Sequence, residues 1–325
     1  MIPWRLARSL RVLLLGGWIA GCGEPAARSP EGRPPGAADL LVFAPHPDDE
    51  ILGCAGIVSR TLSEGRRVRI VLFTNGDGFP GWASLLSGKP VERLGAGDFV
   101  ELGRFRQVQS QLGTLTLGVK PEDLVFLGYP DAGLDRVYQA RGPEPYRQTF
   151  TSMTHTYGPA QGDYHTSAHG APAPYTYSAA LSDLVEILQH SKPGRILVTA
   201  EADRHRDHQA AYRFVRDAVR ATGFNGAFET YLIHGGPEWP WPAGITPESP
   251  FEAHRVKGES VPLGMPWPPP HRLALRPEEQ KLKLSAIRAH ATHLAGALKG
   301  PDAEERDYLD SFVKSEEVFW TGDSR

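Results

Sequence analysis

Residues 39–50 read Asp-Leu-Leu-Val-Phe-Ala-Pro-His-Pro-Asp-Asp-Glu, an apolar run that ends directly in a cluster of imidazole and carboxylate groups. The run 39–44 predicts a buried strand, and the apolar spacing of residues 51–62 predicts a helix after it. The acidic residues between them fall at the positive N-terminal end of that helix. A strand that leads into a helix is the repeating unit of an α/β domain.

The same alternation of strands and helices continues along the chain. Further strands are expected at residues 67–74, 124–127, 195–199 and 229–233, and further helices at 99–112, 178–190, 208–222 and 277–298. This pattern predicts an α/β fold whose sheet is mainly parallel, with right-handed crossovers. In such a sheet ligands bind beyond the carboxyl ends of the strands, so motifs at different strand ends can meet.

Two stretches, 138–177 and 235–272, break this alternation, and both are expected to be loops. The first is rich in Tyr, His, Gly and Pro, whereas the second contains Trp-Pro runs. The tryptophan rings of the second stretch could stack on sugars, or the proline-rich runs could cover the sheet; both interpretations stay open. Residues 317–320 are expected to form a small edge element.

Residues 1–22 are expected to be a signal segment rather than part of the fold. They have a basic start and an apolar stretch too short to span a bilayer, and they end in Ile-Ala-Gly-Cys22. This ending is typical of a bacterial lipoprotein in which Cys22 is lipidated; an ordinary signal peptide with an incidental Cys is the alternative. Residues 23–38 predict a flexible tether, and residues 39–325 a single domain. The expected location is therefore extracytoplasmic, with membrane contact through a lipid anchor only.

The composition narrows the possible partners. The formal net charge of the 325-residue chain is −3, with both signs dispersed. Because there is no basic tract, a nucleic acid is not expected as a partner. If Cys22 is lipidated, Cys54 has no partner for a disulfide, and it is expected to be a small buried residue rather than a nucleophile.

A second polar cluster, Asp203-Arg-His-Arg-Asp-His208, follows the expected strand 195–199. Together the two clusters supply two imidazoles and one carboxylate, from His46, His208 and Asp49, and this is a ligand set of catalytic zinc. Taken alone, an Asp-Asp pair at a helix start is commonly an N-cap, and a His-x-x-His pair is often a solvated helix face. Two such clusters, each directly after a strand, favour a metal site.

The remaining groups of the two clusters fit the acid–base chemistry of a hydrolase. Asp48 is expected to act as the general base. A protonated His205 is expected to stabilise an oxyanion. Asp207 is expected to hydrogen-bond an imidazole and to fix its orientation.

The pattern Pro-His-Pro-Asp-Asp-Glu, followed by Asp-x-His-x-Asp-His, resembles the PIG-L/LmbE family of zinc-dependent N-deacetylases. Residues 74–77, 126–134 and 283–293 also look like family segments in family order. The resemblance implies a Rossmann-like three-layer α/β/α sandwich. It also implies one Zn²⁺ per chain on the ligands given above, the same roles for Asp48 and His205, and substrate contacts from Asp131 and Arg106.

Three positions depart from the family pattern. Arg206 stands where the family usually has proline, which loosens the loop but removes no ligand. Gln109 stands where a glutamate often follows the helix arginine, so a charge is missing near Arg106. His293 stands in place of a Ser-Gln pair and is expected to face solvent.

The expected function is a zinc-dependent hydrolase that removes an acetyl group from an N-acetylated amino sugar or glycoconjugate outside the cytoplasm. One alternative is another metal hydrolase on the same site, acting as an amidase or esterase or on a phosphoester. The other is a sugar-binding lipoprotein with a degenerate site.

Overall fold

The computed structural model describes residues 37–291 and 308–323, and all of them belong to one compact unit. The expected signal segment, the lipidation site Cys22, nearly all of the tether and His293 lie outside these residues. Within the described part of the chain, no helix has the length and apolar character needed to cross a membrane.

The central sheet has seven strands in the order β3, β2, β1, β4, β5, β9, β8. The bounds are β1 (Leu40–Ala44), β2 (Val68–Thr74), β3 (Leu124–Tyr129), β4 (Arg195–Thr199), β5 (Ala227–Tyr231), β8 (His271–Ala274) and β9 (Glu316–Thr321). Strands β1 to β5 pair in parallel, whereas β9 runs antiparallel to both β5 and β8. The prediction of a mainly parallel sheet is therefore confirmed.

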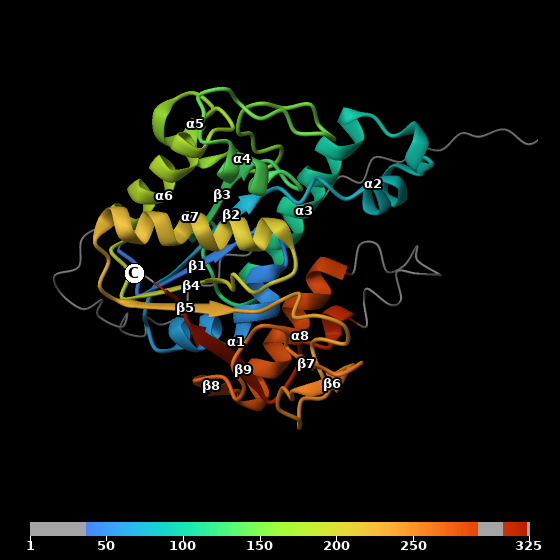
Figure 1. Cartoon of the computed structure of the whole chain (residues 1–325), viewed down its shortest axis with the longest axis vertical. Coiled ribbons are helices and arrows are strands. Elements are labelled where there is room, and N and C mark those ends of the chain that lie inside the picture. Colours follow the sequence, from blue (N-terminus) through green and yellow to red (C-terminus); the bar gives the residue numbers. More distant parts are fainter. Residues whose placement is uncertain (1–36, 292–307, 324–325) are drawn as a thin grey trace, which may run out of the picture. The chain divides into compact units, whose positions relative to one another are not determined.

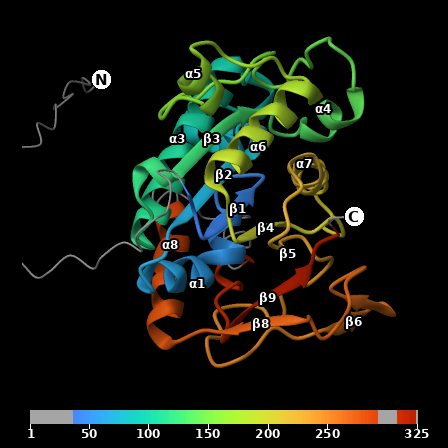
Figure 2. The ribbon, with the colours of Figure 1, turned by 90° about the vertical axis from the view of Figure 1, so that its left-hand side faces the viewer.

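Helices cover both faces of this sheet (Figure 1). On one face lie α1 (Asp49–Ser63), α3 (Ala96–Thr116) and α8 (Pro277–Ala291), and on the other α4 (Leu134–Ala140), α6 (Tyr177–Ser191) and α7 (Arg206–Thr222). Figure 2 shows the two helical layers on opposite sides of the strands. The three-layer Rossmann-like sandwich is confirmed.

Strand β1 shows why the molecule has two cores. Its alternate residues Leu40 and Val42 join the apolar cluster under α1 and α8, whereas Leu41 and Phe43 join the cluster under α6 and α7. Because successive side chains of a strand point to opposite faces, a wholly apolar strand must be buried on both sides. All the residues of β1 are buried, as this argument requires.

The strand order reverses between β1 and β4. Strands β2 and β3 follow on one side of β1, and β4 and β5 on the other. The crossovers therefore leave in opposite directions at this point, which opens a crevice at the carboxyl ends of β1 and β4. Residues 45–50 follow β1 and residues 200–208 follow β4, so both polar clusters lie at the crevice.

The two stretches expected to be loops contain short elements that the sequence did not predict. The first contains α5 (Tyr164–His169), and the second contains the hairpin β6 (His254–Val256) and β7 (Glu259–Val261) and the first half of β8. Another short helix, α2 (Pro80–Ser87), and two 3₁₀ turns, Val91–Arg93 and Pro121–Asp123, were also not predicted. Elements this short have too few residues to show a period.

Packing bears on three further expectations. The element expected at an edge is β9, which instead lies inside the sheet because β8 pairs with its outer side. Trp239 is 3% exposed and stacks on Phe251, so this ring covers the core and is not open to a sugar. Cys54 is fully buried, as expected, and burial raises the pKa of its thiol.

Candidate active site

Three side chains from the two clusters converge at the crevice. His46 Nδ1 lies 3.1 Å from His208 Nε2 and 3.3 Å from Asp49 Oδ2, and His208 Nε2 lies 3.2 Å from the same Asp49 oxygen. His46 is in the turn after β1, Asp49 is the first residue of α1, and His208 is in the first turn of α7. The predicted trio is therefore brought together, with one ligand atom of each residue within 3.3 Å of the other two.

The triangle fits a zinc ion. Bonds of about 2.0–2.2 Å in tetrahedral geometry separate neighbouring ligand atoms by roughly 3.4 Å, close to the three observed distances. Two imidazole nitrogens and one carboxylate oxygen leave the fourth position of a tetrahedron for solvent or substrate. When bound, the zinc would act as a Lewis acid and increase the acidity of a water molecule.

Carboxylates lie next to the second ring nitrogen of both histidines. Asp203 Oδ2 lies 3.1 Å from His208 Nδ1, and the carboxylates of Asp131 and Asp207 lie 3.2 Å and 3.6 Å from His46 Nε2. Such contacts to the second ring nitrogen are the usual support of a metal-binding histidine.

Two of these carboxylates had roles predicted from the sequence. The imidazole next to Asp207 is His46, and Asp207 also accepts hydrogen bonds from the backbone of Ala132 and Leu134. Asp131, expected to contact substrate, faces His46 and accepts a hydrogen bond from the Gly78 backbone. It also lines the cavity described below, so the expected substrate contact stays a prediction.

The electrostatics of the trio favour a cation. Burial lowers the pKa of His208, but the carboxylates of Asp203 and Asp49 outweigh this effect and raise it to about 9. Burial raises the pKa of Asp49, but the two histidines hold it well below its usual value. The surrounding carboxylates thus create a negative field in which positive charge is stabilised, as a metal site requires.

Asp48 has an unusual backbone and does not act as a simple N-cap. Its φ of 128° is far from the values that a non-glycine residue prefers, at a cost of about 1–3 kcal/mol. Its side chain makes no capping hydrogen bond to α1. Instead, Asp48 Oδ2 accepts a hydrogen bond of 2.9 Å from Arg106. The strained turn therefore directs the Asp48 carboxylate away from the helix that it begins.

Arg106 supports this turn, and it also lines the cavity described below. Besides the contact to Asp48, its guanidinium donates to the backbone carbonyls of Pro47 (2.7 Å) and Gly76 (3.2 Å). The predicted substrate contact of Arg106 stays a prediction. Gln109, in place of the family's glutamate, is buried and donates to the backbone carbonyl of His290.

His205 differs from the expectation of a protonated ring. Burial and the nearby positive charge of His46 and His208 lower its pKa to about 3. Its Nδ1 accepts a hydrogen bond of 3.3 Å from the backbone N–H of Asp207, which leaves the proton of the neutral ring on Nε2. A neutral imidazole N–H can still donate to an oxyanion.

A cavity of about 380 Å³ opens above the trio. Its polar lining comes from His46, Asp48, Asp49, Arg106, Asp131, His205 and His234, and its apolar lining from Leu52, Phe79, Ile233 and Leu309. Gly78, Ala132 and Tyr308 complete the wall. The volume is at the size of small-molecule sites, and the mixture of apolar wall and convergent polar groups is typical of them.

Sequence reasoning gave no role to Asp203, which begins the second cluster, and did not single out His234 or Tyr308. His234 stands three residues after β5; its ring centroid lies 4.9 Å from that of His208, and the ring stacks parallel to Tyr308. Burial and the charge of His208 lower the pKa of His234 to about 4. The position of His234 at a strand end was a signal that could have identified it, whereas nothing local marks Tyr308.

Fold and site together define a Rossmann-like α/β protein with a His-Asp-His metal-binding site at the switch point of its sheet. Residues 41–219 match the family described as GlcNAc-PI de-N-acetylase, PIG-L. Because the match extends over more than half of the sequence, the chain belongs to this family. No curated protein matches it.

Solved structures share the fold. The N,N′-diacetylchitobiose deacetylase of Pyrococcus horikoshii is 17% identical, with a TM-score of 0.51 over 87% of this chain and 83% of that chain. The 4-carboxy-2-hydroxymuconate hydratase GalB of Pseudomonas putida KT2440 is 16% identical, with a TM-score of 0.50 over 88% of this chain and 96% of that chain. A deacetylase and a hydratase thus share this fold, so the reaction must be argued from the site.

Proposed function

We propose that this protein is a zinc-dependent hydrolase that removes the acetyl group from an N-acetylated amino sugar or glycoconjugate. The observation that carries the proposal is the triangle of His46 Nδ1, Asp49 Oδ2 and His208 Nε2 beside a cavity that His46, Asp49 and Asp48 line. Membership of a family described as a de-N-acetylase supports the same reaction.

The chain's own residues account for the proton transfers of amide hydrolysis. Asp48 takes a proton from the water that attacks the acetyl carbonyl carbon, and it returns a proton to the amine when the C–N bond breaks. Acetate and a free amino group are the products. The His205 Nε2–H donates to the oxygen that becomes negative as the carbonyl carbon turns tetrahedral. Arg106 holds Asp48 in position for both steps.

The lining of the cavity supports a sugar amide as substrate. Leu52, Phe79 and Leu309 offer apolar surface to an acetyl methyl group and to the C–H face of a pyranose, while Arg106 and Asp131 offer polar contacts to hydroxyl groups. The deacetylase from Pyrococcus horikoshii, which has this fold, is named for an N-acetylated sugar.

Two alternative functions receive less support from the site. Phosphoester chemistry usually uses two metal ions, but the extra carboxylates Asp131 and Asp207 already accept backbone hydrogen bonds and face the back of His46. A degenerate binding site would have no reason to keep the ligand triangle and the strained turn at Asp48 together.

We further propose that the protein works outside the cytoplasm, anchored by a lipid on Cys22. This part rests on the sequence of residues 1–22 alone. It predicts that the wild-type protein sediments with membranes and that Cys22→Ala moves the protein into the soluble fraction.

The experiment that tests the reaction is a screen for acetate release from N-acetylated sugars and cell-envelope fragments. We expect release that stops on chelation and returns with added Zn²⁺. The matched control is Asp48→Asn purified in the same way, since acetate that this variant still releases comes from a contaminating enzyme. Release that survives chelation, or none from any substrate with zinc-loaded protein, would contradict the proposal.

A further inference from the structure

A second group of metal-ligating side chains lies on α5 and α6, outside the active site. His165 and His169 are four residues apart on α5, so they share one face of the helix, and their ring centroids are 4.4 Å apart. Opposite them on α6 lie Asp183 and Glu186. Figure 1 shows α5 beside one end of α6. The stretch is the His- and Tyr-rich one for which the proposed function has no role.

The contacts between the two helices resemble those of a metal site. His165 Nδ1 is 2.7 Å from Asp183 Oδ1, and His169 Nε2 is 2.9 Å from Glu186 Oε2. One ligand atom each of His165, His169 and Asp183 lies within 4.8 Å of the others. Two imidazoles and a carboxylate are the same donor set as in the active site, and it suits zinc and its neighbours among the transition metals.

The carboxylate of Asp183 is preorganised. Its side chain is 1% exposed, and its second oxygen accepts a hydrogen bond of 2.7 Å from the Tyr129 hydroxyl, which fixes the first oxygen towards the imidazoles. A buried carboxylate oriented by a neighbouring hydroxyl matches the support that metal ligands usually receive. The side chains of His165 and His169 are 24% and 42% exposed, so an ion can reach the site from solvent.

We infer that His165, His169 and Asp183 bind a second transition-metal ion of the zinc type, with Glu186 orienting His169. The ion cross-links α5 to α6. Helix α5 has only six residues, far below the length at which a helix is stable alone. Its stability therefore depends on contacts with other parts of the protein, and a metal ion shared with α6 supplies such contacts.

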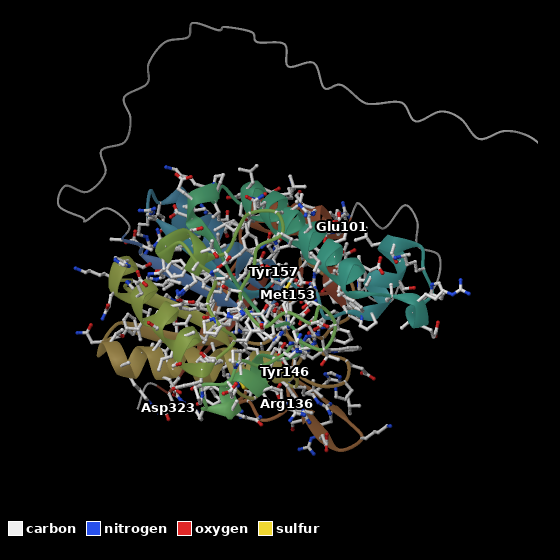
Figure 3. All side chains as sticks on the ribbon, turned by 90° about the horizontal axis from the view of Figure 1, so that it is seen from above. Glu101, Arg136, Tyr146, Met153, Tyr157 and Asp323 are labelled. Atoms are coloured by element: carbon white, nitrogen blue, oxygen red, sulfur yellow. The ribbon has the colours of Figure 1, made fainter. Side chains whose placement is uncertain are left out.

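The metal cross-link supports the active site through residues 141–176, the segment between α4 and α6 that contains α5. Gln148 donates a hydrogen bond of 3.0 Å to the backbone carbonyl of Asp131, and the Tyr157 hydroxyl donates to Asp77. Figure 3 shows Tyr146, Met153 and Tyr157 along this segment. The ion therefore fastens one end of a segment whose middle supports the cavity wall.

The test counts metal ions bound to the untagged full-length protein after chelator treatment and titration with Co²⁺. We expect about two equivalents for the wild type and about one for His169→Gln and for His165→Ala combined with His169→Ala. The control is His155→Ala, which removes an exposed imidazole from the same segment and should keep both equivalents. The Co²⁺ that remains in the α5 variants should keep the visible spectrum of the active-site ion.

His208→Ala separates the two sites, because it should lose the active-site ion and retain the one on α5. A wild type that binds a single equivalent, lost in His208→Ala, would overturn the inference and leave two ordinary histidine–carboxylate hydrogen bonds. Retention of both equivalents by the His165→Ala, His169→Ala variant would also overturn it. His169→Gln guards against misfolding, since the residue is on the surface.

Discussion

Asp203→Asn probes the support of the metal site without touching a ligand. Asp203 is fully buried, and its Oδ2 contacts His208 Nδ1 and the backbone N–H groups of Ile233 and His234, while its Oδ1 accepts from the backbone of His205. Burial raises its pKa, but the charge and the hydrogen bond of His208, with the charge of His234, lower it to about 2. One carboxylate thus connects the ends of β4 and β5 to the ligand on α7.

The size of the effect follows from these four contacts. Asparagine keeps one oxygen, so its NH₂ group must face either the His205 N–H or the donors on the other side. One buried donor is left unsatisfied in the better arrangement, which costs about 1–3 kcal/mol of unfolding free energy. Loss of the charge behind His208 weakens metal binding by about 10–100-fold.

The assay is a competition titration of Zn²⁺ against a chromogenic chelator, with denaturant unfolding of the same samples. The matched control is Asp123→Asn, another buried carboxylate, which pairs with Arg67 at the opposite end of the sheet. The control should lose stability and keep wild-type zinc affinity. Wild-type affinity in a folded Asp203→Asn protein would refute the role assigned to this carboxylate.

The remaining predictions concern the general base Asp48, its support by Arg106, and the stability of the fold at acidic pH. Asp48→Ala should abolish turnover and keep zinc, whereas His208→Ala should lose both. Metal analysis of each variant, beside the acetate assay, tests this difference. Zinc loss in Asp48→Ala would overturn the assignment of Asp48 as the base. Arg106→Lys cannot reach three acceptors at once, so kcat should fall by about 10–100-fold at unchanged metal content; an unchanged kcat would contradict this. Glu279, whose pKa two arginines lower to about 2 against the effect of burial, should stabilise the fold by about 2–3 kcal/mol above pH 4.5 and lose this contribution as pH falls towards 2. The unfolding free energies of wild type and Glu279→Gln should therefore converge in acid, while the exposed Glu278→Gln tracks the wild type throughout; a gap independent of pH would show that the carboxylate charge is not responsible.

Much of the architecture was predictable because its signals are local. Each strand from β1 to β4 is a mainly apolar run followed by a helix, and a parallel sheet with short crossovers is the arrangement that buries such runs on both faces. The ligands His46, Asp49 and His208 were predictable for a related reason. They stand in the segments that connect β1 and β4 to the helices after them or in the first turn of those helices, and the carboxyl ends of parallel strands share one edge.

The parts that were missed depend on contacts between distant residues. Strand β9 lies inside the sheet because β8 pairs with it, and nothing in residues 316–321 shows that partner. Helix α5 is too short to show a period, and its histidines gain significance only from Asp183 on α6. Whether the Trp239 ring is open to a ligand depends on Phe251, which stacks on it and is twelve residues away in the chain.

The amino-acid sequence thus determined which chemical groups stand at the strand ends, because apolar runs and their spacing involve residues that are close together in the chain. The three-dimensional arrangement decided which group supports which. It assigned Asp207 and Asp131 to the back of His46, Asp203 to His208, and Arg106 to the strained turn at Asp48. The physical reason is that hydrogen bonds and ion pairs act over a few ångströms, and only folding brings residues so far apart in the chain within that range.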